Sequence, residues 1–352
     1  MNANKSCSAS FKLDTATLNV LRSGNGTVTS NPSGINCGTA CSKNYAKGTN
    51  VTLSAKASSG SLFAGWTGGG CQGLTDCTVS LANSTSVNAT FLGQGRSAIG
   101  IFRPATGEWF LDMNGNGIWD GCNVDLCSGP FGSPDDLPVT GNWTGTGISN
   151  IGVFRPSTGE WFLDLNGNGK WDGCTIDLCL RSVSSPNALP VIGDWNGSGL
   201  DRIGELIFGR TPTWYLDTSG DGIANCNSDL CLKFLTNDGD LAVAGDWNAT
   251  GKAKIGIFRP STGAWYLDLN GDGQWKNCNF ELCVKSFGFA GDRPIAGDWT
   301  GNGTAKIGIY RPSTGEWFLD LNGNGKWDGS PNDGYSQFLN RQDGDLPVVG
   351  IW

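Results

Sequence analysis

The segment Ile151-Gly-Val-Phe-Arg-Pro-Ser-Thr-Gly-Glu-Trp-Phe-Leu-Asp-Leu-Asn-Gly-Asn-Gly-Lys-Trp-Asp172 returns almost unchanged as residues 307–328. Related copies fill residues 96–352 with five units of about 52 residues, most of which end in Gly-Asp-Trp or a close variant. Such a period is typical of proteins in which each unit buries its apolar face only by packing on its neighbours. The repeat therefore decides the architecture of most of the chain.

Each unit contains four candidate strands. In the second unit they are residues 150–155, 160–165, 176–180 and 189–193, with a Pro-Ser-Thr-Gly turn joining the first two. Four strands repeated five times predict an all-β fold, a five-bladed β-propeller over residues 96–352, with a linear β-solenoid as the alternative. The first unit lacks its leading strand, and residues 346–352 supply it. A ring closed in this way leaves no exposed sheet edge, which favours the propeller.

Residues 1–92 have a different pattern. Their alternating apolar and polar residues, broken by Gly, Asn and Pro, predict an all-β module. The segments Gly26-Thr-Val-Thr-Ser-Asn-Pro32, Val51-Thr-Leu53 and Phe63-Ala-Gly-Trp66 resemble the divergent internalin-B-type bacterial repeat. This resemblance covers most of residues 18–91 and implies a small β-grasp-like module that serves as a spacer in surface proteins.

The 13 cysteines indicate an oxidising compartment, because cytosolic thiols are kept reduced. We expect six disulfides, between Cys37 and Cys41, Cys71 and Cys77, Cys122 and Cys127, Cys174 and Cys179, Cys226 and Cys231, and Cys278 and Cys283. A thiolate metal site is the alternative in the repeats, although soft sulfur ligands suit a hard-oxygen loop poorly. Cys7 is left over. It either belongs to a preceding copy of the module, whose ending residues 8–11 resemble, or is an unpaired terminal thiol.

An acidic loop follows the second strand of every unit. In residues 164–172 it places oxygen ligands at positions 1, 3, 5 and 9, a backbone carbonyl at position 7 and Gly at position 6, which suits Ca²⁺, and a further acid follows. The predicted ligands are Asp112, Asn114, Asn116, Asp120 and Asp125; Asp164, Asn166, Asn168, Asp172 and Asp177; Asp217, Ser219, Asp221 and Asp229; Asp268, Asn270, Asp272 and Glu281; and Asp320, Asn322, Asn324, Asp328 and Asp333.

The third and fourth loops carry a compensating change. Position 9 becomes Asn225 or Lys276, and position 5 becomes Asp221 or Asp272, so that each loop keeps three carboxylates. Turn formation alone does not require this compensation. The pattern therefore predicts up to five Ca²⁺ ions, with plain Asx-Gly turns as the alternative.

A second loop follows each Gly-Asp-Trp. The run Ile-Gly-Ile-Phe-Arg-Pro-Ser-Thr-Gly at residues 255–263 and loops such as residues 194–199 resemble the FG-GAP and VCBS-type repeats of integrin-like propellers. The resemblance covers residues 96–352 and implies Ca²⁺ in these loops. Here, however, positions 3 and 5 are neutral, and position 9 is Asn150, Arg202, Lys254 or Lys306. We therefore expect these loops to be free of metal, with the cationic side chain paired to the Asp.

Tryptophan and arginine recur in the units. Trp161 and Trp195 lie in strands and are expected in the core. A Trp within the acidic loop either packs over a neighbouring loop or stacks on a ligand, and these residues are Trp119, Trp171, Trp275 and Trp327. An Arg before the hairpin Pro is expected to pair with an adjacent Asp, and these residues are Arg103, Arg155, Arg259 and Arg311.

The composition of the chain argues against several classes of function. The chain has no His, which excludes Ser-His-Asp and Cys-His chemistry and His-ligated zinc. A net charge of −8 argues against nucleic acid, and no apolar run is long enough to insert into a membrane. The start has no signal-peptide pattern. The acids belong to repeated loops, so we expect no enzyme. The clearest break in the repeat, residues 208–214, lies near Glu205, which has no evident catalytic partner.

These observations predict a non-catalytic, calcium-stabilised display or adhesion module of a bacterial protein that is secreted or held at the cell surface. We expect it to be part of a longer multi-module chain, with a surface protein or a glycan as its partner. The alternatives are a multivalent carbohydrate-binding propeller lectin and an architectural subunit of a fibre or surface layer.

Overall fold

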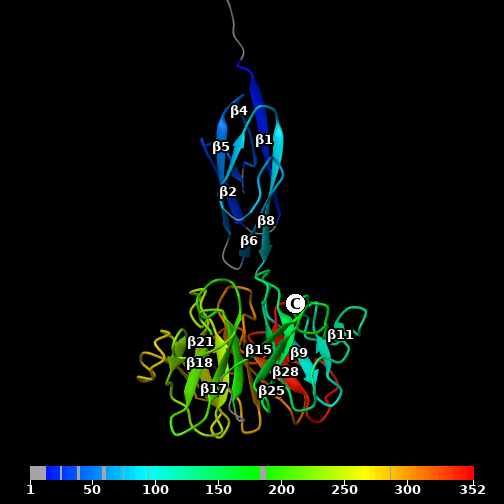
Figure 1. Ribbon diagram of the computed structural model, residues 1–352, viewed down its shortest axis with the longest axis vertical. Coiled ribbons are helices and arrows are strands. Elements are labelled where there is room, and N and C mark those ends of the chain that lie inside the picture. Colours follow the sequence, from blue (N-terminus) through cyan, green and yellow to red (C-terminus); the bar gives the residue numbers. More distant parts are fainter. Residues whose placement is uncertain are drawn as a thin grey trace, which may run out of the picture. The chain divides into compact units, whose positions relative to one another are not determined.

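The computed structural model describes residues 13–352, except 24–25, 38–39, 58–60, 74, 94, 183–187 and 286. The predicted all-β class is confirmed, because every regular element in these residues is a strand. No helix there is long and apolar enough to cross a membrane. The chain divides into two compact units, Met1–Gly93 and Gln94–Trp352 (Figure 1). Cys7 and residues 8–11, on which the expectation of a preceding module depends, lie outside the described residues.

The N-terminal unit consists of two four-stranded sheets around one core. The first has the order β4-β1-β8-β6, with β1 (Thr15–Ser23), β4 (Ser42–Ala46), β6 (Ser61–Thr67) and β8 (Thr85–Gly93). The second has the order β3-β2-β5-β7, with β2 (Gly26–Asn31), β3 (Asn36–Cys37), β5 (Asn50–Ala57) and β7 (Cys77–Ser80). Strands β1 and β8 are parallel, and alternate residues such as Leu18 and Val87 are fully buried.

The second unit contains five four-stranded antiparallel sheets, which we number 1 to 5. Sheet 1 contains β28 (Leu346–Gly350), β9 (Ala98–Arg103), β10 (Glu108–Leu111) and β11 (Leu126–Ser128). Sheet 2 contains β12 (Leu137–Gly141), β13 (Asn150–Arg155), β14 (Glu160–Leu163) and β15 (Leu178–Arg181). Sheet 3 contains β16 (Leu189–Gly193), β17 (Arg202–Ile207), β18 (Thr213–Leu216) and β19 (Leu230–Leu232).

The last two sheets follow the same order. Sheet 4 contains β20 (Leu241–Gly245), β21 (Lys254–Arg259), β22 (Ala264–Leu267) and β23 (Leu282–Val284). Sheet 5 contains β24 (Arg293–Gly297), β25 (Lys306–Arg311), β26 (Glu316–Leu319) and β27 (Gly334–Ser336). Two predicted strand ends in the second repeat are wrong by two residues. The strand predicted at 160–165 ends at Leu163, and the one predicted at 176–180 begins at Leu178. The reason is that Asp164 and Asp177 fold the intervening residues into the acidic loop.

The last strand completes the first sheet, as the sequence predicts. Strand β28 pairs antiparallel with β9, with Val348 opposite Gly100, and the two lie side by side in Figure 1. The first strands of the five sheets, β12, β16, β20, β24 and β28, contact one another in cyclic order and line a cavity of about 200 Å³. Four of them carry a Pro facing this cavity, which is tolerated because the inner edge of these strands has no ladder partner.

Each sheet is also hydrogen-bonded to the next. The residue before the second strand donates its N–H to the residue that follows the first strand of the preceding sheet, at 2.7–3.0 Å between N and O. These pairs are Ser149 to Ile351, Asp201 to Asn142, Ala253 to Asp194, Ala305 to Asp246 and Ser97 to Asp298. Apolar clusters fill the space between sheets, as where Phe258 and Trp265 of sheet 4 pack with Ile309 of sheet 5. Burial between sheets is thus what holds each repeat in place.

Candidate metal sites

The first carboxylate of each acidic loop is buried and holds the loop turn. In sheet 2, Asp164 accepts the N–H groups of Gly167 and Gly169, both at 2.7 Å between N and O. Both glycines have positive φ, 71° and 72°, a conformation that other residues adopt at a cost. The equivalent Asp112, Asp217, Asp268 and Asp320 bind backbone N–H groups of their own loops in the same way.

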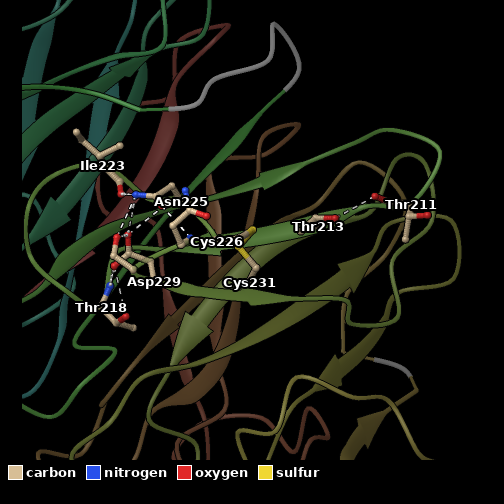
Figure 2. Close-up of a disulfide and its surroundings, with 10 residues drawn as sticks. Thr211, Thr213, Thr218, Ile223, Asn225, Cys226, Asp229 and Cys231 are labelled. Carbon is tan, nitrogen blue, oxygen red and sulfur yellow. Dashed lines mark hydrogen bonds between the residues drawn. A yellow bond between two sulfur atoms is a disulfide. The ribbon is translucent and has the colours of Figure 1, made fainter.

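The third acid of each set reaches back to the same loop. Figure 2 shows Asp229 between the two ends of the third loop, where it accepts the N–H groups of Thr218 at 3.0 Å and Asn225 at 3.2 Å. Asp125, Asp177 and Asp333 clamp both ends of their loops equally, and Glu281 accepts the N–H of Leu269. The structure therefore places the third acid at the loop in every repeat.

The remaining predicted ligands are arranged in two ways. In the third and fourth repeats, the carboxylate oxygens of Asp217, Asp221 and Asp229, and those of Asp268, Asp272 and Glu281, lie within 4.8 Å of one another. Among the described residues, the other three loops do not form such a group. Instead, their position-9 acid is held by amide donors, as where Asn166 and Asn168 donate to Asp172. The same contacts join Asn114 and Asn116 to Asp120, and Asn322 and Asn324 to Asp328.

The buried acids are electrostatically crowded. Burial, and to a lesser extent the third acid of the same loop, raise the pKa of Asp112, Asp164 and Asp320. Burial and the nearby Asp272 raise the pKa of Asp268. A cation placed between two such carboxylates would relieve this repulsion, and carboxylate, amide and carbonyl oxygens are the ligands that Ca²⁺ takes in proteins.

The second loop of sheet 4 holds an internal cation. The Nζ of Lys254 lies 3.1 Å from Oδ1 of Asp246, 2.6 Å from Oδ1 of Asn248 and 2.6 Å from Oγ1 of Thr250. It also donates to the carbonyl of Lys252 at 3.0 Å. The ammonium therefore occupies the place among these oxygens where a metal ion would sit, and the predicted pairing of a cation with the loop Asp is present here.

The same pairing is not found in the other second loops. Lys306 donates to Oγ1 of Thr300 and to the carbonyl of Leu321, not to Asp298. Arg202 makes no ion pair with Asp194 among the described residues, and its buried Nε has no hydrogen-bond partner there. Its guanidinium instead lies against Gly220 of the acidic loop. The prediction of an Asp–cation pair is thus wrong for these two loops, because the side chains of Arg202 and Lys306 reach the acidic loop of their own sheet instead.

The structure joins all six predicted cysteine pairs as disulfides. Those in the repeats link the end of the acidic loop to the outer strand. Figure 2 shows the third, between Cys226 and Cys231, with Asp229 beside it. Each closes a short loop around the third acid. The fifth repeat has Ser330 and Tyr335 at these positions.

We expect the double replacement of Cys226 and Cys231 by Ser to lower the free energy of unfolding by about 2 kcal/mol, because the cross-link no longer restricts the unfolded chain. Urea unfolding of the oxidised protein, followed by tryptophan fluorescence, measures this. In excess reductant the variant and the wild type should become equal in stability. A difference that persists in reductant would mean that Ser disturbs local packing instead.

The loop tryptophans lie between adjacent sheets. Trp171 meets Phe162 of its own sheet and Phe131, which follows the outer strand of sheet 1, edge-on, with ring centroids 5.1 Å and 5.9 Å apart. Trp119 and Trp275 bridge two sheets in the same way, and Trp327 packs on Phe318. The packing interpretation agrees with these contacts. Stacking on a ligand stays a prediction, for which Trp171 and Trp327 are the more exposed, at 38% and 41%.

Four sheets contain an Arg–Asp pair whose carboxylate is buried. Each Arg expected to find an Asp binds the one that precedes the first strand of its own sheet: Arg103 with Asp345, Arg155 with Asp136, Arg259 with Asp240, and Arg311 with Asp292. These four Asp residues are not among those predicted from the sequence. The signal was available, because sheet 3 lacks both partners together, with Ile207 in place of the Arg and Ala188 in place of the Asp.

Sheet 3 carries a buried acid instead. Glu205 is 1% exposed, where the equivalent residues are Ile101, Val153, Ile257 and Ile309. Its Oε1 accepts a hydrogen bond from Nε1 of Trp161 at 3.2 Å and another from the hydroxyl of Ser182. Burial raises its pKa to about 7. These contacts join sheet 3 to sheet 2.

Comparison with known families bears on the N-terminal unit. Residues 16–94 match the divergent InlB B-repeat domain. The B-repeat match confirms the resemblance read from residues 18–91 and covers both sheets of that unit. The chain has no significant match among curated proteins. The family match does not extend to residues 96–352, so their resemblance to FG-GAP and VCBS-type repeats stays a prediction.

Proposed function

We propose that residues 96–352 form a five-bladed β-propeller which binds Ca²⁺ in its acidic loops and serves as an extracellular display or adhesion module. The cyclic contacts of the five first strands and the pairing of β28 with β9 support the propeller. Calcium binding is supported mainly by the first and third acids, which both bind each acidic loop. In repeats 3 and 4 a third carboxylate lies beside them.

The residues of these loops fit Ca²⁺. The third loop would hold the ion with Asp217, Asp221 and Asp229, together with the hydroxyl of Ser219 and a backbone carbonyl. In repeats 1, 2 and 5, the two loop amides would have to turn from the position-9 Asp to offer their oxygens. The fourth loop already has a competing cation, because Lys276 pairs with Asp272. We therefore expect the third loop to bind most tightly.

The N-terminal unit and the disulfides favour a surface protein. The B-repeat match and the six disulfides both fit an extracellular bacterial protein. The repeated acids have a structural role in every loop, and Glu205 is engaged by Trp161 and Ser182. We accordingly propose a binding role rather than an enzymatic one, with a surface protein or a glycan as partner.

Thermal melting of the oxidised protein in EDTA and in millimolar Ca²⁺, with bound ions counted by equilibrium dialysis, tests this proposal. We expect Ca²⁺ to raise the melting temperature and the count to approach five. No shift and no bound ion would reduce the acidic loops to hydrogen-bonded turns.

Two matched variants locate the ions. Asp221→Asn removes an exposed carboxylate of the third loop and should lower the count by one. Asp246→Asn makes the same change in the loop that Lys254 occupies, and the count should not change. An equal loss of ions in both variants would contradict the assignment of the metal to the acidic loops.

A further inference from the structure

The junctions between consecutive sheets are not equally filled. At each junction, one side chain of the outer strand lies against a Gly of the next acidic loop. At three junctions this side chain is large: Leu180 on Gly222, Leu232 on Gly273 and Val284 on Gly325. At the two junctions that flank sheet 1 it is Ser128 or Ser336, whose hydroxyl donates to the glycine carbonyl. The smaller serines leave more room on both sides of sheet 1.

The junction between sheets 5 and 1 loses further bulk. Gly334 begins the outer strand of sheet 5, where the other outer strands begin with Leu. Ala98 begins the second strand of sheet 1, where the other second strands begin with Asn150, Arg202, Lys254 or Lys306. Gly334 and Ala98 are smaller than their counterparts in every other sheet, and Ser336 is smaller than the Leu or Val at three of the other junctions. They open a cavity of about 160 Å³, walled by side chains that include Ile99 and Leu321. In a chain that otherwise repeats itself closely, these changes concentrate at one place.

A guanidinium lies at this cavity without a carboxylate partner. Arg96 is exposed, contacts Gly115 and donates to its carbonyl. Among the described residues it forms no ion pair. In sheet 4 the cation that lies against the corresponding glycine, Lys254 against Gly271, is neutralised by Asp246, but sheet 1 has Ile351 where sheet 4 has this Asp. The positive charge of Arg96 is therefore available to a ligand.

The acid nearest the cavity does not cancel this charge. Asp112 lines the cavity but is 1% exposed, and its two oxygens accept the N–H groups of Gly117 at 2.7 Å and Asn116 at 3.2 Å. The rim offers the hydroxyl of Ser97, and the half-exposed ring of Tyr335 forms one side. Small-ligand sites commonly combine such apolar walls with a few polar groups that fix orientation.

We propose that the cavity between sheets 5 and 1 binds a single carboxylated sugar ring, with the sugar carboxylate on the guanidinium of Arg96. The volume suits one pyranose ring, one of its hydroxyls would meet Ser97, and Tyr335 offers an aromatic face. An apolar peptide side chain would leave these polar groups without partners. The inference rests on the proposed display function and gives it a ligand class: acidic glycans rather than neutral ones.

The test is a titration of the full chain with D-glucuronate in the presence of Ca²⁺, by calorimetry and saturation-transfer NMR. We expect weak, saturable binding of glucuronate and at least tenfold weaker binding of D-glucose. Arg96→Ala should weaken glucuronate binding at least tenfold. Ser336→Leu, which introduces the residue found at two other junctions, should fill the cavity and have a similar effect without disturbing the fold.

Arg341→Ala is the matched control, because it removes another exposed guanidinium, one that pairs with Asp343. This variant should bind glucuronate as the wild type does. Absence of binding, equal binding of glucose, or binding unaffected by Ser336→Leu would overturn the inference, as would tighter binding of an acidic peptide. The ion count separates the two proposals, since glucuronate binding can fail while five ions are bound.

Discussion

Replacing Arg103 by Ile is expected to lower the free energy of unfolding by about 3–5 kcal/mol, because it leaves a buried carboxylate without its cation. The guanidinium of Arg103 donates to both oxygens of Asp345, at 2.9 and 3.1 Å, and the two side chains are only 9% and 1% exposed. Arg103 ends β9, and Asp345 directly precedes β28, so the pair joins the first repeat to the last strand. Urea unfolding followed by tryptophan fluorescence measures the loss.

The third repeat provides the control. It has Ile207 and Ala188 where the other sheets have Arg and Asp. The double variant R103I/D345A copies that arrangement into sheet 1, and we expect it to recover stability to within about 1 kcal/mol of the wild type, since removing both charges leaves neither unpaired. If R103I alone costs less than about 1 kcal/mol, then water or another group compensates Asp345, and the pair is not what anchors β28.

The fold was predictable because the repeat exposes it several times. The strand at Glu160–Leu163, its hairpin to β13 and the closing strand β28 follow from residues that recur in register. Strand ends were less predictable. Asp164 continues the alternating pattern of β14, yet its carboxylate turns back to bind Gly167 and Gly169. A competing side chain-to-backbone hydrogen bond of this kind is not visible in apolar periodicity.

The candidate sites were predictable to different degrees. The third acid could be placed at its loop because the disulfide and the short spacing leave it little choice, as for Asp229 beside Cys226. The orientation of long cations could not. Lys254 and Lys306 occupy equivalent positions, yet one binds its own loop Asp and the other binds Thr300 and a carbonyl. The cavity at Arg96 depends on the small residues Ala98 and Gly334, whose effect becomes clear only when the junctions are compared in space.

We expect the titration of Glu205 to make the free energy of unfolding depend on pH. Burial raises the pKa of this carboxyl from 4.5 to about 7 in the folded protein. The folded state therefore favours the protonated form. Its contribution is fully present below about pH 4.5 and is lost as pH rises through 7. The difference of about 2.5 pKa units corresponds to about 3 kcal/mol.

Glu205→Ile places in sheet 3 the residue that sheets 1, 4 and 5 have at this position, and Trp161 keeps the hydroxyl of Ser182 as its acceptor at 3.0 Å. We expect the variant to match or approach the wild type near pH 4.5 and to exceed its free energy of unfolding by about 3 kcal/mol at pH 8. Urea unfolding of both proteins in EDTA, from pH 4.5 to 8, gives the difference between their free energies of unfolding. The titration of the acidic loops is the same in both proteins and therefore cancels. Glu205→Gln keeps the shape and a hydrogen-bond acceptor but does not titrate, so its stability relative to Glu205→Ile should be independent of pH. A constant difference between wild type and Glu205→Ile from pH 4.5 to 8 would mean that the carboxyl keeps one protonation state throughout, and that packing alone distinguishes the third repeat from the others.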